Sequence, residues 1–222
     1  VYKRQPIAGE LYFMYATMLI AVPTGVKVFN WITTMYKGAL TFETPMLFCI
    51  AFVILFTFGG FTGMMLSIAA ADTQYHDTYF VVAHFHYVMV AGAVFSGTAA
   101  IYYWLPKWCG RMYDETMGKV QFWLAFIAFN ITFMPQHFLG LAGMPRRYSD
   151  YGLQFADWNM VSSIGAFMYG GAQLLFLFNV IRTIGWGKPV EDPKVWEGAD
   201  GLEWTLPTPP PFHTFSTPPV VK

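Results

Sequence analysis

The 222-residue chain has little charge and little cysteine. Only 12% of its residues are charged, and 13 Lys and Arg balance 13 Asp and Glu. This balance excludes the strongly basic surface that is typical of nucleic-acid-binding proteins, so we expect no nucleic-acid partner. The two cysteines, Cys49 and Cys109, fall in an apolar run and in a loop, and we expect no disulfide between them.

Apolar residues are abundant instead, at 55% of the chain, and 19% of the residues are aromatic. Runs of about 20 apolar residues, enough to cross a hydrocarbon core about 30 Å thick, recur along the chain. We predict an all-α, polytopic transmembrane helical bundle with five spans, at about 11–35, 45–70, 79–104, 118–142 and 160–184.

Two segments flank these spans. Residues 1–10 contain no initiator Met and no signal peptide, and the VYKRQ start indicates a fragment or a split subunit. Residues 185–222 form a Pro-rich tail that includes TLPTPPPFHTFSTPP, for which we expect extended, polyproline-like structure.

The positive charges predict how the spans are oriented. Most cations fall on one side, which the positive-inside rule assigns to the cytoplasm or the mitochondrial matrix, together with the C-terminal tail. These cations are Lys37, Lys107, Arg111, Lys119, Arg182, Lys188, Lys194 and Lys222. The adjacent Arg146 and Arg147 fall on the opposite side, so we expect a local anionic partner for them.

His84 and His86 lie within the apolar run VVAHFHYVMV. Residues two apart on a helix point about 200° from each other, so the two imidazoles face opposite flanks and do not share one metal ion. This arrangement suits two cofactors, one on each side of the helix, that each receive one axial imidazole. The alternative is a pair of hydrogen-bonded packing histidines.

His76 and Asp77 lie where the chain enters the third span, and they offer a nitrogen and a hard oxygen side by side. That combination suits Mg²⁺ or Mn²⁺. The alternative is an ordinary helix cap in which Asp77 or Thr78 accepts hydrogen bonds from backbone N–H groups. The two interpretations are compatible.

Lys27 lies near the middle of the first span, where an ammonium group costs roughly 2.5–3.5 kcal/mol on insertion scales. Pro23 interrupts the helical hydrogen bonds just before it, and Thr24 lies on the same helical face. Lys and Thr together can hold water, which favours a proton path. The alternative is a lysine whose side chain reaches the membrane interface.

Four motifs together resemble one family. HDTYFVVAHFHYVMV, IAVPTGVKVFNW, FTFGGFTG and MPQHFLGLAGMPRRYSDY are similar, in order and spacing, to motifs of subunit I of the haem-copper terminal oxidases. The resemblance runs from about Gly9 into the tail. It implies that the five spans correspond to the last five of the family's twelve helices, in the C-terminal part of the catalytic subunit.

The resemblance also implies roles for individual residues. His84 would ligate the high-spin haem where O₂ is reduced, His86 would ligate the low-spin haem, and Phe85 would lie between the two haems. The remaining implied roles are a Mg²⁺ or Mn²⁺ site at His76 and Asp77, a propionate region at Arg146, Arg147 and Asp72, and a proton path at Lys27 and Thr24.

The implied activity is that of a proton-pumping cytochrome c oxidase of the respiratory chain, which contributes to oxidative phosphorylation in the bacterial plasma membrane or the mitochondrial inner membrane. Asp77 disfavours the quinol-oxidising branch, where the aspartate of this motif is typically replaced. Cytochrome c is therefore the implied electron donor, through a copper centre in subunit II. Haem A is the implied haem, and subunit III is a further implied partner.

The family's active-site copper is held by histidines that would lie outside this chain. Only His137 and His213 remain without an implied role, and neither rebuilds that site. We therefore expect O₂ reduction only when the chain is joined by the missing N-terminal part of subunit I. Two alternatives stay open, namely a quinol oxidase of the same superfamily and a non-enzymatic membrane protein that binds haem.

Overall fold

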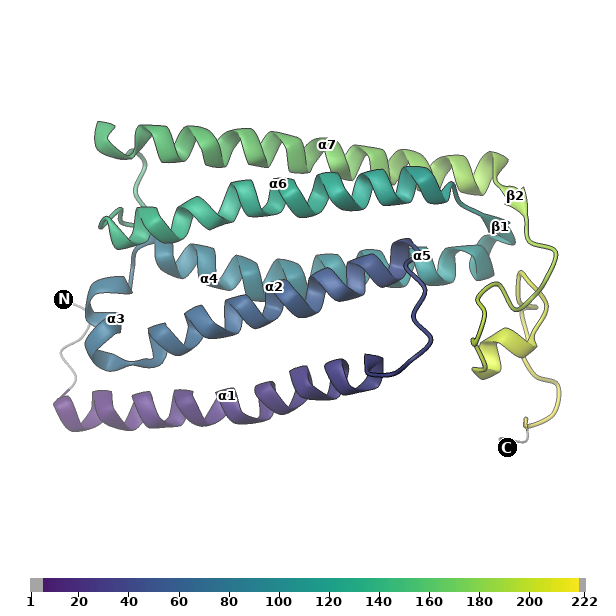
Figure 1. The fold of residues 1–222 in the computed structure, drawn as a ribbon, viewed down its shortest axis with the longest axis horizontal. Helices are drawn as coiled ribbons and strands as arrows, with labels where there is room; N and C mark the ends of the chain where they lie inside the picture. Colours follow the sequence, from purple (N-terminus) through teal and green to yellow (C-terminus); the bar gives the residue numbers. More distant parts are fainter. Residues whose placement is uncertain (1–5, 220–222) are drawn as a thin grey trace.

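The computed structural model describes residues 6–219, and five long helices run side by side in it (Figure 1). They are α1 (Ile7–Met35), α2 (Thr44–Ser67), a composite helix over Tyr79–Cys109, α6 (Glu115–Leu141) and α7 (Ala156–Trp186). All five are long and apolar enough to cross a membrane. The predicted all-α fold with five spans is therefore confirmed.

The composite helix is not uniform along its length. It consists of α4 (Tyr79–Met89), the π-helical segment η1 (Val90–Phe95) and α5 (Ser96–Cys109). The Ser96 hydroxyl donates a hydrogen bond to the Gly92 carbonyl within the wide π turn. Apolar periodicity predicted one uninterrupted helix here, because a single π turn leaves no distinct mark in a run of apolar residues.

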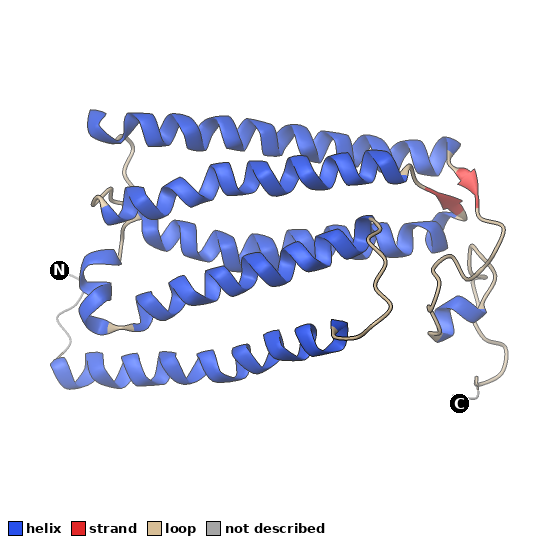
Figure 2. Ribbon diagram, viewed as in Figure 1, coloured by secondary structure: helices blue, strands red, loops and turns tan. Residues whose placement is uncertain are grey.

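Short elements complete the described part of the chain (Figure 2). α3 (Ala69–Tyr75) lies mostly between the predicted spans 45–70 and 79–104, where no helix was predicted. The short helices η2 (Leu153–Phe155) and η3 (Leu202–Thr205) are 3₁₀ turns. The strands β1 (Arg111–Met112) and β2 (Lys188–Pro189) pair antiparallel and join the start of α6 to the end of α7.

The core of the bundle is aromatic. Phe48 of α2, Tyr87 of α4, Tyr102 of α5 and Phe129 of α6 are each at most 2% exposed and belong to one cluster. By contrast, α1 contributes no buried residue to the core. It contacts α2 through the Trp31 ring.

The loops and short elements gather at the two ends of the bundle (Figure 1). One end, called here the tail end, contains residues 36–43, 110–114 and 187–219. The cations that were predicted for the inner side, as far as the structure describes them, lie at or near this end. Residues 68–78 and 142–155 lie at the other end, called here the α3 end. Arg146 and Arg147 lie at the α3 end, as their sequence position indicated, whereas Lys222 lies outside the described residues.

The tail is irregular, not uniformly extended as expected, and it folds back on α5. The Lys107 ammonium, which is only 2% exposed, donates hydrogen bonds to the Leu206 carbonyl at 2.6 Å and the Thr208 hydroxyl at 3.0 Å. The Trp196 indole N–H donates to the Tyr103 carbonyl at 2.9 Å. Composition favoured an extended tail, but these long-range bonds to one buried cation and one helix decide its path.

Candidate functional site

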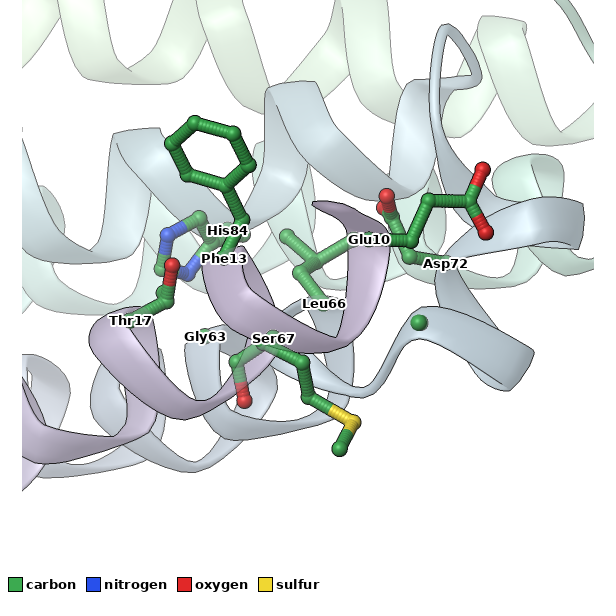
Figure 3. A pocket seen from close by; sticks show the side chains of 10 residues that line it. Glu10, Phe13, Thr17, Gly63, Leu66, Ser67, Asp72 and His84 are labelled. Atoms are coloured by element: carbon green, nitrogen blue, oxygen red, sulfur yellow. The ribbon is translucent and has the colours of Figure 1, made fainter. Parts of the chain in front are cut away.

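A cavity of about 460 Å³ lies near the α3 end, between α1, α2, α3 and α4 (Figure 3). His84 of α4 contributes its imidazole to this cavity, beside Phe13 and Thr17 of α1. The other labelled lining residues are Glu10, Gly63, Leu66, Ser67 and Asp72. The cavity therefore combines apolar side chains with carboxylates near its outer end and one imidazole deeper in the bundle.

The hydrogen bonds of His84 fix which ring nitrogen carries the proton. Its Nδ1 lies 2.9 Å from the Gly59 carbonyl oxygen and 3.2 Å from the Thr62 hydroxyl, which itself donates to the same carbonyl at 2.9 Å. Because a carbonyl oxygen only accepts, Nδ1 carries a hydrogen, and in the neutral ring Nε2 then has the lone pair. A neutral imidazole oriented in this way is the form that ligates a metal through Nε2.

Gly63 brings the backbone of α2 against the His84 ring. A Cβ atom at this position would meet the His84 Cε1 atom at 2.7 Å, which is closer than van der Waals contact allows. Sequence reasoning did not assign roles to Gly59, Thr62 or Gly63 beyond their place in the FTFGGFTG motif. The sequence signal that could have indicated these roles is the glycine-rich stretch inside an apolar helix, because such glycines often mark a close approach by another group.

His86 faces the opposite flank of α4. Its ring stacks on Phe133 of α6, with centroids 4.2 Å apart and planes at 16°, and on Phe85 at 4.6 Å. Its Nδ1 lies 2.7 Å from the Val82 carbonyl oxygen, so Nδ1 again carries a hydrogen, and in the neutral ring Nε2 has the lone pair. One helix thus presents two imidazoles in different directions, His84 toward α2 and His86 toward α6.

At the α3 end, the two loops that close the bundle are joined through Asp77 and Arg146. The Arg146 Nε donates to the Asp77 carboxylate at 3.2 Å, and the Arg146 backbone N–H donates to the Asp77 carbonyl at 2.9 Å. Asp77 and Arg147 adopt left-handed backbone angles, with φ of 56° and 67°. Asp77 is therefore an anionic partner for Arg146 within this chain, while Arg147 is exposed at the same end.

The helix cap here is Thr78, since its hydroxyl accepts from the Phe80 backbone N–H at 3.3 Å. Of the two caps considered from the sequence, Asp77 is thus not the one used. The His76 Nδ1 bonds the Asp72 carbonyl at 2.8 Å, which leaves its Nε2 available. No group of three His, Cys, Asp or Glu side chains able to hold a metal ion occurs within residues 6–219. The metal site at His76 and Asp77 therefore stays a prediction.

Lys27 is exposed on α1 in the described structure, with its ammonium 5.9 Å from the centroid of the Trp31 ring. The Thr24 hydroxyl donates to the Ile20 carbonyl of its own helix at 3.0 Å. The pairing of these two side chains through water stays a prediction. Both side chains nevertheless lie on the helix that lines the cavity at His84, several turns toward the tail end.

The two remaining histidines differ in environment. His137 is 5% exposed among the rings of Phe58, Phe80 and Tyr87, and neither of its ring nitrogens has a hydrogen-bond partner among the described residues. His213 is exposed in the tail. His137 is therefore packed in the bundle, remote from the tail histidine, and the two do not form one site.

Comparisons with known proteins identify the family that the chain resembles. Residues 1–168 match the family model described as cytochrome c and quinol oxidase polypeptide I. The chain is 56% identical over 210 residues to cytochrome c oxidase subunit 1 of Cereibacter sphaeroides, covering 94% of this chain and 37% of that protein. It is 51% identical over 220 residues to the protein of the same name from Bacillus sp. strain PS3, covering 98% of this chain and 35% of that protein.

The fold is also found in a solved structure. A haem-copper terminal oxidase dimer, determined by cryo-electron microscopy, matches with a TM-score of 0.72 and 16% identity, covering 83% of this chain and 39% of that one. The chain thus spans just over a third of the length of the curated relatives that it matches.

Proposed function

Because the chain belongs to the family of cytochrome c and quinol oxidase polypeptide I, we propose that it forms the C-terminal, haem-binding part of the catalytic subunit of a proton-pumping cytochrome c oxidase. The observation that carries this proposal is the pair of imidazoles on opposite flanks of α4, each with Nδ1 bonded to a carbonyl. The curated relatives named cytochrome c oxidase subunit 1 support cytochrome c as the electron donor.

Two haems would be held by α4. His84 would ligate the high-spin haem in the cavity of about 460 Å³, and His86 would ligate the low-spin haem on the other flank. When bound, these groups supply the iron that receives electrons and the iron that binds O₂. The carbonyls of Gly59 and Val82 hold each Nδ1 proton, which increases the basicity of Nε2 and fixes the ring plane.

Phe85 lies next to both ligands in sequence and stacks on His86, so we assign it a position between the haems. Its ring would exclude water from the space between the two flanks of α4. We infer haem A for both sites from the family resemblance alone.

The α3 end would bind the charged edges of the haems. Arg146 and Arg147 would donate to the propionates, with Asp72 in the same region on the wall of the cavity. His76 and Asp77 would contribute two ligands to Mg²⁺ or Mn²⁺, and Asp77 would do so while it holds Arg146 in place at 3.2 Å.

Proton uptake would involve Lys27 and Thr24 on α1. Lys27 carries an ammonium on a membrane-length helix, where such a group is expensive unless it faces a polar path. Residues supplied by the rest of the oxidase would have to cover this face of α1 and connect Lys27 to the cavity.

The proposed assembly contains further components. The active-site copper ligands would come from the part of subunit I that corresponds to the N-terminal two thirds of the relatives, and electrons would arrive from cytochrome c through the copper centre of subunit II. Subunit III is a further proposed partner, and O₂ is the substrate. We place the complex in a bacterial plasma membrane or the mitochondrial inner membrane, with the tail end on the cytoplasmic or matrix side.

Substitution of the two histidines tests this function in the assembled enzyme. His84→Ala should abolish or alter the carbon monoxide difference spectrum, because the five-coordinate iron would lose its protein ligand on that face. His86→Ala should instead disturb the low-spin spectrum and block electron entry. Haem content, measured alongside, separates lost ligation from failed assembly. Two variants that keep both haem spectra intact would refute the ligand assignment.

A further inference from the structure

His137 of α6 is a buried histidine that the proposed haem chemistry does not use. It is 5% exposed, and neither of its ring nitrogens makes a hydrogen bond to a residue within 6–219. A buried polar group left in this way typically costs about 1–3 kcal/mol. A leucine or a phenylalanine would fill the same space without that cost, so a specific role for the imidazole is worth testing.

Aromatic rings from two other helices surround the His137 imidazole. Its plane is nearly perpendicular to the Phe58 ring of α2, at 88° with centroids 5.6 Å apart, and to the Phe80 ring of α4, at 82° and 5.3 Å. The Tyr87 ring of α4 lies at 5.4 Å and 56°. In perpendicular pairs the positive edge of one ring meets the negative face of the other. A ring face is therefore the acceptor that this environment offers to an imidazole N–H.

The three rings around this imidazole are next to His84 and its hydrogen-bond partner. Phe80 precedes His84 by four residues and Tyr87 follows it by three, so both lie on the same side of α4 as His84. Phe58 is adjacent in sequence to Gly59, whose carbonyl oxygen lies 2.9 Å from the His84 Nδ1. The imidazole of α6 thus contacts both helices whose relative position sets that hydrogen bond.

The helices approach one another closely at this junction. A Cβ atom at Gly59 of α2 would lie 3.0 Å from the Tyr87 Cβ atom, and one at Gly140 of α6 would overlap the Phe80 backbone. Such close packing leaves little room for side chains to rearrange without movement of the backbone. A change in the ring of His137 is therefore transmitted to α2 and α4.

We propose that His137 is a positioning residue for the high-spin haem ligand. An N–H of its ring donates to an aromatic face where α2, α4 and α6 meet, and this contact holds the His84 imidazole against the Gly59 carbonyl. The inference rests on the proposed function, because it takes His84 as a haem ligand. It gives His137 an effect on the haem that is exerted through His84.

His137→Phe in the assembled oxidase tests this role, because it keeps an aromatic ring and removes both nitrogens. The readout is the iron–histidine stretching band of the reduced high-spin haem in resonance Raman spectra, which reports on the bond to the His84 Nε2. We expect a shifted or split band, with both haems bound and stability close to wild type, because an apolar group of similar shape can replace a polar one almost neutrally. An unchanged band would overturn the proposal.

His137→Gln and His137→Leu separate polarity from volume, and they decide the question if the phenylalanine variant does not assemble. Gln retains an N–H donor, whereas Leu has none. The band of His137→Gln should therefore lie closer to wild type than the band of His137→Leu. Equal shifts in these two variants would show that the nitrogens do not matter and would overturn the proposal.

Phe138→Leu is the matched control on the same helix. Phe138 is 46% exposed and its ring lies against Trp158 of α7, away from α2 and α4. This variant should leave the band unchanged, and a shift as large as in His137→Phe would overturn the specific role of His137.

Haem content and the carbon monoxide difference spectrum, recorded on the same samples, test the proposed function separately. If the iron–histidine band of the wild-type oxidase persists in His84→Ala, both the ligand assignment and this inference fail. If that band depends on His84 but is unaffected by every change at His137, only the positioning role fails.

Discussion

Gly63→Ala is the substitution whose effect the structure defines most sharply. The added methyl group would lie 2.7 Å from the His84 Cε1 atom, so the imidazole must tilt or shift along α4. Such a shift moves Nε2, which we propose as the haem ligand, and strains the Nδ1 hydrogen bond to the Gly59 carbonyl. We expect the assembled variant to bind the high-spin haem with an altered carbon monoxide difference spectrum.

The matched control is Gly60→Ala on the same helix, where a Cβ atom would meet nothing within 4 Å. Both changes replace Gly by Ala inside α2, so the helix-propensity gain of up to about 1 kcal/mol cancels between them. The difference in unfolding free energy between the two variants then comes from the overpacking at His84, which costs about 1–3 kcal/mol. Gly63→Ala should thus be less stable than Gly60→Ala by about this amount.

The assay combines reversible denaturation in detergent with the carbon monoxide spectrum of each variant. Gly60→Ala should retain the wild-type spectrum and stability at or slightly above wild type. If the two variants unfold at the same denaturant concentration and share one unchanged spectrum, the close approach of α2 to His84 does not position the imidazole, and the reasoning fails.

Three other predictions follow from named contacts. Lys27→Met should slow O₂ consumption severely while both haems stay bound, and normal turnover in a correctly assembled variant would rule out the proton path. In enzyme grown with excess manganese, Asp77→Ala should weaken the Mn²⁺ paramagnetic signal, whereas an unchanged signal would leave Asp77 only its ion pair with Arg146. Asp114 accepts from the Met117 N–H at 3.0 Å and pairs with Arg182 at 2.9 Å, and these contacts, the Met117 bond foremost, lower the pKa of its carboxyl. Asp114→Asn should lower stability by less than about 1 kcal/mol at neutral pH. A carboxyl whose pKa is lowered in the folded state stabilises the fold at pH values above the unfolded pKa of about 3.9, and this stabilisation is lost as the pH falls through the folded pKa. The melting temperatures of variant and wild type should therefore converge as the pH is lowered. A difference in melting temperature between Asp114→Asn and wild type that persists at the lowest pH would show that the Asp114 charge is not its cause.

Much of the architecture was determined by the sequence alone. Long apolar runs dictate helices in a membrane, because backbone polar groups there must bond within their own segment, and this fixed the number of spans. The spacing of His84 and His86 likewise dictated opposite directions, because two residues on an α-helix are about 200° apart. The packing of His84 toward α2 and of His86 toward α6 agrees with that geometry.

Other features depend on which segments meet in space, and sequence spacing does not specify that. The Gly59 carbonyl reaches His84 across 25 residues, and Asp77 pairs with Arg146 across 69, so neither partner is identifiable from its local pattern. The tail shows the same limit. Its proline content favours extended structure, but the buried Lys107 ammonium must be satisfied, and the Leu206 carbonyl and Thr208 hydroxyl satisfy it at 2.6 and 3.0 Å. Local sequence determined the helices and their directions, whereas the tertiary structure decided which distant polar groups satisfy one another, because that choice depends on the packing of the whole bundle.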